Sequence, residues 1–129
     1  AEELAAEDIQ FDCVLTLEVV EHVADLESFL AASAQLVRPG GMFFAATLNR
    51  TAASYLLGIV AAERILRWVP PGMHQWSKFV RPSELVASLR SHGVAIDDIS
   101  GLTYDPLSRA WALSRKVAVN YIASGTKKI

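Results

Sequence analysis

Glu18, Glu21 and His22 lie within five positions of one another, directly after an apolar run. If residues 19–22 form a helical turn, spacings of three and four residues place the three side chains on one side of it. Two carboxylates and an imidazole can then hold a divalent cation: carboxylates favour magnesium, whereas an imidazole favours zinc or manganese. The same groups can also move protons, because an imidazole titrates near neutral pH. The residue types alone leave these possibilities open.

The elements around this group predict a β-α-β unit. Residues 11–17, FDCVLTL, form a short apolar run that is typical of a buried strand. Asp25 is a suitable N-cap for the helix that follows, and RPGG at residues 38–41 ends that helix. Residues 42–48, MFFAATL, form a second apolar run. We therefore expect parallel strands in a sheet covered on both faces, with the group at the carboxyl end of the first strand, where open α/β sheets bind ligands.

The remaining segments predict two helices and two strands. Residues 52–69 are apolar around most of a helical circumference, and their charged residues fall on one arc. A shorter amphipathic helix begins at Pro82 and ends before Gly93. Residues 94–99 and 117–122 are strand-like, and we expect them to pair antiparallel because a turn-rich loop joins them.

Composition limits the classes of protein and partner. The chain has 129 residues, of which 52% are hydrophobic, so one domain with a packed core is expected. The formal net charge of −2 predicts no broad basic face, so nucleic acid is not an expected partner. Cys13 is the single cysteine, which excludes an internal disulfide, and we expect it to be buried in its strand.

Residues 11–51, FDCVLTLEVVEHVADLESFLAASAQLVRPGGMFFAATLNRT, resemble the second half of a class I S-adenosylmethionine-dependent methyltransferase. In that family FD opens the fourth strand, an EHV-x-D segment follows it, and L-x-PGG leads into the fifth strand. The resemblance implies a Rossmann-like α/β fold with a mostly parallel sheet and an antiparallel final strand.

One signature of that family is absent from this chain. Such enzymes bind the methyl donor with a glycine-rich loop after their first strand, and no G-x-G precedes Phe11. The chain also begins without Met. We therefore expect residues 1–129 to be a partial methyltransferase domain, strands four to seven of the family fold, that is inactive alone. The rest of a longer protein, or a partner copy, would cover its exposed sheet edge.

The downstream segments narrow the resemblance. LNRT, H-x-W-x-KF, PSEL, GL-x-Y-x-PL and VNY together look like the ubiquinone-biosynthesis O-methyltransferases, from about Phe11 to Tyr121. The resemblance implies methyl transfer from S-adenosylmethionine to a phenolic hydroxyl of a polyprenylated quinol precursor. Two alternatives remain: another small-molecule methyltransferase of this class, or a non-catalytic, membrane-associated scaffold.

The resemblance also assigns roles to the opening group. It implies that Glu18, Glu21 and His22 fall on metal-binding positions, with magnesium the usual ion, and that Leu17 contacts the adenine or ribose of S-adenosylmethionine. Two other interpretations compete with metal binding. The group either lines the donor pocket of a metal-free enzyme, or His22 is a catalytic general base that takes the phenol proton while Glu21 orients it.

Several other polar residues are candidates for acceptor contacts, each with a structural alternative. His74 lies in the loop expected over the acceptor site, and Asn49 and Arg50 either contact the acceptor or cap the next helix. Tyr104 and Asp105 either line the acceptor mouth or form a turn around Pro106. His92 precedes the glycine that ends a helix, so we expect a structural role for it.

The helix expected over residues 52–69 is a candidate membrane contact, because an apolar face bordered by arginines suits a bilayer interface. The alternative is a core or dimer helix. The resemblance implies a peripheral protein, cytoplasmic at the inner membrane of a bacterium or on the matrix face of the mitochondrial inner membrane in a eukaryote. Expected partners are the polyprenylated phenol, the membrane surface, and a second copy of the chain or other ubiquinone-pathway proteins.

Overall fold

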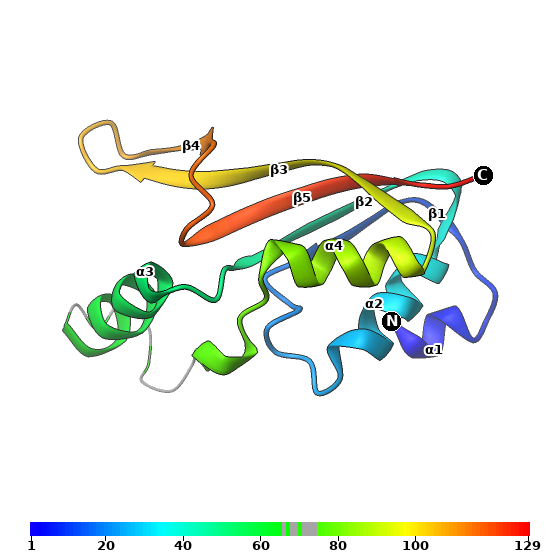
Figure 1. The fold of residues 1–129 in the computed structure, drawn as a ribbon, viewed down its shortest axis with the longest axis horizontal. Helices are drawn as coiled ribbons and strands as arrows, with labels where there is room; N and C mark the ends of the chain where they lie inside the picture. The colour runs from blue at the N-terminus through cyan, green and yellow to red at the C-terminus, as the bar shows by residue number, and fades with distance from the viewer. Residues whose placement is uncertain (66, 68–69, 71–74) are drawn as a thin grey trace.

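The structure, a computed structural model, contains one five-stranded sheet with helices packed on it (Figure 1). It describes residues 1–65, 67, 70 and 75–129, without the side chains of residues 58 and 62–64. In chain order the elements are α1 (Glu2–Ala5), β1 (Phe11–Leu17), α2 (Leu26–Gln35), β2 (Val37–Leu48), α3 (Ala52–Ser54), η1 (Tyr55–Ile65), η2 (Trp76–Lys78), α4 (Pro82–Ser91), β3 (Val94–Asp105), β4 (Ala110–Ser114) and β5 (Asn120–Lys127).

The strand order in the sheet is β1-β2-β5-β3-β4. β1 and β2 are parallel, whereas β5 runs antiparallel to both of its neighbours, β2 and β3. β1, β2 and β3 therefore point the same way, and their carboxyl ends lie at one edge of the sheet. The α/β class and the antiparallel final strand are confirmed. β4, which forms an antiparallel hairpin with β3, was not expected.

The helices α1, α2 and α4 all lie on one face of the sheet (Figure 1). The core between them is apolar and includes Leu30 of α2, Leu85 of α4 and Phe43 of β2, each with 0% exposure. Tyr121 of β5 is also fully buried, and its hydroxyl donates to the carbonyl oxygen of Val80 at 2.9 Å. This packing fixes the position of β5 in the middle of the sheet.

The opposite face of β1 is uncovered, so the expectation of a sheet covered on both faces is wrong for this chain. Side chains alternate across a strand, and the odd-numbered residues of β1 all point to the open face. Phe11, Leu15 and Leu17 are 42%, 61% and 52% exposed. Cys13 lies in the same row and is exposed, so the prediction of a buried cysteine is also wrong.

Local sequence signals explain most of the element boundaries. The carboxylate of Asp25 accepts hydrogen bonds from the backbone of Glu27 and Ser28, which confirms it as the N-cap of α2. α4 begins with Pro82 at its first position, and Gly93 follows its end at a φ of 82°.

Three strands differ from their predicted ranges. β3 runs to Asp105 rather than to residue 99, because its last residues pair with β4. β2 begins at Val37 rather than residue 42, because Val37 already pairs with Phe11 of β1, and RPGG lies within the strand. A Cβ at Gly41 would lie 2.9 Å from the carbonyl oxygen of Arg38, so the bent start of β2 needs glycine there. β5 begins at Asn120 and extends to Lys127, several residues later than predicted, because it pairs along the whole length of β2.

The predicted helix over residues 52–69 is observed as far as residue 65. Thr51 caps it: its hydroxyl oxygen accepts from the backbone of Ser54, whose hydroxyl oxygen accepts from the backbone of Thr51 in return. From Tyr55 the helix is π-helical, with a wider turn than the α-helical period used to predict its apolar face. Residues 66, 68 and 69 of the prediction lie outside the described residues. Among helices of described residues, none is long and apolar enough to cross a bilayer.

Candidate functional site

Glu18 occupies the first position after β1, at the carboxyl edge of the sheet. Its backbone N–H donates to the carbonyl oxygen of Ala46 at 2.8 Å, so the chain is still held to β2 at this point. Its φ of 54° lies in the left-handed region, which residues other than glycine adopt rarely. Such strain is frequent at functional sites, where the surrounding structure enforces it.

Glu21 lies one short turn further on and is only 3% exposed. Its Oε2 atom accepts a hydrogen bond from the Thr47 hydroxyl of β2 at 2.8 Å. Its Oε1 atom is buried and has no hydrogen-bond partner within the described part of the chain. A buried carboxylate oxygen without a partner carries a large desolvation cost, so a donor or a cation at Oε1 would be favourable.

The carboxyls of Glu18 and Glu21 interact with each other, and we call them the carboxylate pair. Burial of the Glu18 carboxyl, followed by its interaction with the Glu21 carboxyl and the repulsion between the two charges, raises the pKa of Glu18 to about 7. The residue is exposed as a whole, but its carboxyl lies against the buried Glu21. The pair can therefore exchange a proton near neutral pH.

The structure brings together two of the three residues predicted as metal ligands. His22 is exposed, and in the residues that the structure describes no three His, Cys, Asp or Glu side chains form a metal-ligating group. Leu17, predicted to contact the methyl donor, is half-exposed at the end of β1, opposite Ala46 of β2.

Asn49 connects the end of β2 to the segment before β5. Its side-chain Nδ2 donates to the carbonyl oxygen of Val117 at 2.7 Å, and its backbone N–H donates to that of Val119 at 2.8 Å. Its Oδ1 atom is buried and, like Oε1 of Glu21, has no hydrogen-bond partner in the part of the chain that the structure describes. Within the described residues, two buried acceptor oxygens therefore lack donors at this edge of the sheet.

Arg50 is occupied by structural contacts: it forms an ion pair with Glu84 of α4 and donates to the carbonyl oxygen of Ser77. Neither Asn49 nor Arg50 provides the N-cap of the next helix, because Thr51 has that role.

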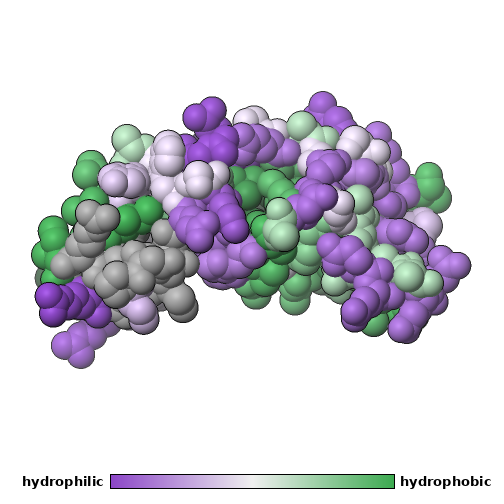
Figure 2. All heavy atoms as spheres, turned by 90° about the horizontal axis from the view of Figure 1, so that it is seen from below, coloured by the Kyte–Doolittle hydropathy of each residue, from purple (hydrophilic) through white to green (hydrophobic). Residues whose placement is uncertain are grey.

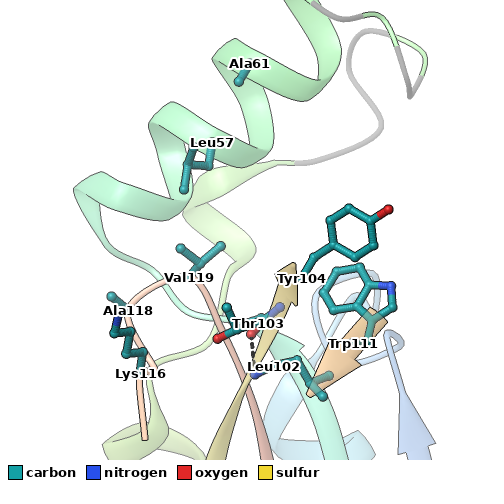
Figure 3. Close-up of a pocket in the computed structure, with 10 residues that line it drawn as sticks. Leu57, Ala61, Leu102, Thr103, Tyr104, Trp111, Lys116, Ala118 and Val119 are labelled. Atoms are coloured by element: carbon teal, nitrogen blue, oxygen red, sulfur yellow. Dashed lines mark hydrogen bonds between the residues drawn. The ribbon is translucent and has the colours of Figure 1, made fainter. Parts of the chain in front are cut away.

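An apolar pocket of about 560 Å³ lies at the same edge, between η1 and the β3–β4 hairpin (Figure 3). Leu57 and Ala61 line it from η1, and residues 102–104 and Trp111 line it from the hairpin. The remaining wall consists of Lys116 and residues 118–120. Figure 2 shows apolar atoms gathered at the end of the molecule that contains α3 and η1. Volumes of this size are typical of small-molecule sites.

Backbone contacts set the shape of this pocket. A Cβ at Gly101 would lie 1.8 Å from the carbonyl oxygen of Lys116, so glycine alone allows the segment before β5 to cross β3 closely. The backbone N–H of Leu102 donates to Oδ1 of Asn120 at 2.9 Å, which ties β3 to β5 (dashed in Figure 3). The rings of Tyr104 and Trp111, with centroids 5.2 Å apart and planes inclined at 46°, pack together on one wall.

The other candidates separate into structural and pocket residues. The Asp105 carboxylate accepts from the backbone of Leu107 and the hydroxyl of Ser108, so it forms a turn, whereas Tyr104 lines the pocket. His92 pairs with Glu27 of α2 at 2.7 Å, as its predicted structural role requires. His74 lies outside the described residues.

Sequence reasoning missed Trp111. The alternation in AWALS at residues 110–114 was the available signal for the strand that contains it.

Residues 1–99 match the family described as "Methyltransferase domain". A "Ubiquinone biosynthesis O-methyltransferase" of Rhizobium etli (strain CIAT 652) is 52% identical over 127 residues, 98% of this chain and 51% of that protein. A protein of the same name from Methylobacterium sp. (strain 4-46) is 48% identical over 126 residues, again 98% and 51%. The chain spans about half the length of these curated relatives. The predicted resemblance is confirmed.

Solved structures show the same fold at low sequence identity. A possible histamine N-methyltransferase from Thermotoga maritima has a TM-score of 0.62 at 16% identity, covering 94% of this chain and 58% of its own. The magnesium protoporphyrin IX methyltransferase of Synechocystis PCC 6803 has a TM-score of 0.59 at 16% identity, covering 97% and 48%. The predicted Rossmann-like class I fold is thereby confirmed, and the match over residues 1–99 shows that this chain belongs to the methyltransferase-domain family.

Proposed function

We propose that this chain is the acceptor-side half of an S-adenosylmethionine-dependent O-methyltransferase that acts on a phenolic hydroxyl of a polyprenylated quinol precursor in ubiquinone biosynthesis. The observation that supports this most strongly is the identity of about half of all positions with ubiquinone biosynthesis O-methyltransferases over nearly the whole chain. Since the chain covers half of those relatives, the donor-binding loop belongs to the other half of the domain on this proposal.

The carboxylate pair supplies the proton acceptor for this reaction. The phenol O–H bond breaks as its proton passes to Glu18, and the phenolate oxygen attacks the methyl carbon of the sulfonium. The O–CH₃ bond forms while the S–CH₃ bond breaks, which leaves S-adenosylhomocysteine neutral at sulfur. A carboxylate with a pKa of about 7 suits this step, because a general base works best when its pKa lies near the working pH.

The carboxylate pair also fits a divalent cation, with magnesium favoured. Magnesium is commonly bound through one or two carboxylates while water and substrate oxygens complete its coordination, so it does not need a third protein ligand. The buried, unpartnered Oε1 of Glu21 beside the carboxyl of Glu18 is the observation that supports this fit. When bound, such a cation would stabilise the negative charge of the phenolate.

His22 and Leu17 keep their predicted roles as proposals. His22 directly follows Glu21 in the sequence, and its side chain is exposed. It is the third candidate metal ligand or, alternatively, a general base. The position of Leu17 at the carboxyl end of β1 is where ligands of open α/β sheets bind, which supports a contact with the donor.

Peripheral membrane binding and the corresponding locations, the bacterial inner membrane or the mitochondrial matrix face, are also proposed. The support is a row of exposed apolar side chains on the helix after β2, with Leu56 at 58% and Ile65 at 70% exposure, followed by the exposed Arg67. A second copy of the chain or another ubiquinone-pathway protein remains the proposed alternative partner for this surface.

The test is methyl transfer by the full-length gene product to a prenylated catechol, with and without a chelator, for wild type and Glu18→Gln. We expect Glu18→Gln to lower kcat about hundredfold, because it removes the proton acceptor while retaining shape. Magnesium binding measured by calorimetry, which does not depend on turnover, should weaken in the same variant. Methyl transfer only to unrelated small molecules would contradict the assigned substrate, and unchanged kcat in Glu18→Gln would contradict the assigned base.

A further inference from the structure

We propose that the apolar pocket between η1 and the β3–β4 hairpin receives the isoprenoid chain of the acceptor. This inference rests on the proposed function, which supplies a phenol with such a chain, but it concerns a place that shares no residue with the carboxylate pair. Three observations support this inference. They are the apolar lining of the pocket, the hydrogen bonds that polar side chains of the lining already make within the protein, and the link from one wall to the end of β2.

The lining offers apolar surface that a hydrocarbon chain would cover. Leu57 and Trp111 face the pocket from opposite sides and are 57% and 65% exposed (Figure 3). Ala61, one turn of helix beyond Leu57, adds a small apolar side chain to the same wall (Figure 3). Covering such exposed apolar side chains with a hydrocarbon removes their contact with water, which is favourable.

Two polar side chains of the lining, Asn120 and Thr103, have hydrogen-bond partners within the protein. Oδ1 of Asn120 accepts from the backbone of Leu102 at 2.9 Å, and the hydroxyl of Thr103 donates to that of Ser114 at 2.9 Å. Lys116 also lines the pocket and is exposed, so its stem can cover a chain while its ammonium stays in water. Among the described residues of the lining there is no carboxylate to recognise a cationic ligand, so a neutral hydrocarbon is the ligand that these residues suit.

The pocket wall is joined to the polar end of the sheet. Asn49 at the end of β2 binds the carbonyl oxygens of Val117 and Val119, and the hydroxyl of Thr51 donates to that of Ala118. A chain held against residues 118–120 therefore leads toward the end of β2, where the buried oxygens of Glu21 and Asn49 lack donors. The hydroxyls of a phenolic head group are donors of the kind that these oxygens lack.

The experiment measures binding of farnesol, an isoprenoid without a phenol, to the full-length gene product by calorimetry, with oleate as a second probe. Leu57→Ser removes an apolar lining group, and Leu56→Ser is the matched control, because Leu56 is 58% exposed on the same helix and does not line the pocket. A second pair on β4 is Trp111→Ser with its control Leu113→Ser, which are 65% and 66% exposed.

We expect farnesol to bind the wild type and both controls alike, and to bind Leu57→Ser and Trp111→Ser about tenfold more weakly. Oleate should bind more weakly than farnesol. The proposal is overturned if farnesol does not bind, if lining and control variants weaken equally, or if oleate binds as tightly as farnesol.

Kinetics separate this proposal from the proposed function. The KM for a farnesylated catechol should rise about tenfold in Leu57→Ser, while the KM for the same catechol without the chain stays unchanged. Equal changes for both catechols would overturn the pocket assignment. If neither catechol is methylated but farnesol binds as expected, the proposed function fails and the pocket stands as an isoprenoid site.

Discussion

The two ends of the carboxyl edge of the sheet differ in whether their polar side chains have hydrogen-bond partners. At the β1–β2 end, Glu21 and Asn49 are buried, and one oxygen of each has no hydrogen-bond partner among the residues that the structure describes, while Glu18 is held in a left-handed conformation. At the η1 and β3–β4 end, Asn120 and Thr103 have partners, and large apolar groups face solvent instead. The first end is prepared for polar chemistry and the second for an apolar ligand.

This difference suggests that the two ends of the edge bind different parts of one ligand. Buried oxygens without donors are costly, and exposed aromatic and aliphatic groups gain little until they are covered. The β1–β2 end therefore has buried oxygens that need donors, and the other end has apolar side chains in contact with water. A single amphipathic molecule with a polar head and an apolar chain would satisfy the oxygens and cover the apolar side chains.

Glu21→Gln is the strongest test of whether the two ends act separately. The amide keeps the shape but removes the charge beside Glu18, so we expect kcat to fall about hundredfold for catechols with or without a prenyl chain. Initial rates with a labelled methyl donor measure this effect in the full-length gene product. A loss confined to the prenylated catechol would show that the two ends are not separate.

Gly101→Ala tests how the apolar end is built. The added Cβ would overlap the carbonyl oxygen of Lys116, so the segment before β5 must move away from β3. We expect the free energy of unfolding to fall by about 2 kcal/mol, as overpacked sites commonly show. Urea unfolding measures the fall, and Gly40→Ala, at a glycine whose added Cβ would have space, separates the close contact from the strain of a positive φ. A smaller loss at Gly101 than at Gly40 would contradict this account.

The polar end predicts a dependence of stability on pH. The pKa of Glu18 rises from 4.5 to about 7 on folding, so the folded protein holds this proton more tightly than the unfolded chain. Stability from this group is therefore complete below about pH 4.5 and falls as the pH rises to about 7. We expect a loss of about 1 kcal/mol after allowing for solvent screening.

Urea unfolding in the presence of a chelator, from pH 4 to 8, measures this loss, and Glu18→Gln should flatten it. Glu7→Gln, at an exposed glutamate before β1, is a control for general effects of charge. A profile that Glu18→Gln leaves unchanged would show that the carboxylate pair does not share a proton in solution.

Thr51→Ala should have the smallest effect. It removes the cap of the helix that covers the apolar pocket and the hydrogen bond to Ala118, so we expect about 1 kcal/mol less stability. The KM for the prenylated catechol should rise more than that for the unprenylated one, because the helix with Leu57 begins here. An equal rise for both substrates would mean that the helix start affects the polar end as well.

Local signals in the sequence predicted the fold where a residue acts on its own neighbourhood. Asp25, Pro82 and Gly93 fix helix ends through nearby backbone groups, and their roles were predicted correctly. Burial depends instead on which elements cover a strand, and the apolar run around Cys13 does not show that one face of β1 is open. The hairpin with β4 was missed for a similar reason, because tertiary pairing rather than local propensity defines it.

The candidate site likewise combines contacts within one segment with contacts between segments that are distant in the sequence. The spacing of Glu18 and Glu21 predicted that their side chains share one side of a turn, and their carboxyls interact in the structure, while the roles predicted for them stay predictions. The partner of Glu21 is Thr47, which is 26 residues away and depends on the pairing of β1 with β2. The apolar pocket joins segments up to 63 positions apart, from Leu57 to Asn120, and no motif within one segment marks it.

The central place of β5 has a consequence for how the chain folds during synthesis. β2 and β3 do not pair with each other, so the sheet becomes continuous only when β5 inserts between them. Ribosomes make β5 after the other strands, and its contacts with β2 join residues 72 to 84 positions apart, from Leu48 with Asn120 to Met42 with Thr126. Such non-local pairing slows folding, so the β1–β2 and β3–β4 pairs must wait as separate units for their last strand. A nascent chain stalled before residue 120 would therefore expose both inner strand edges to other chains.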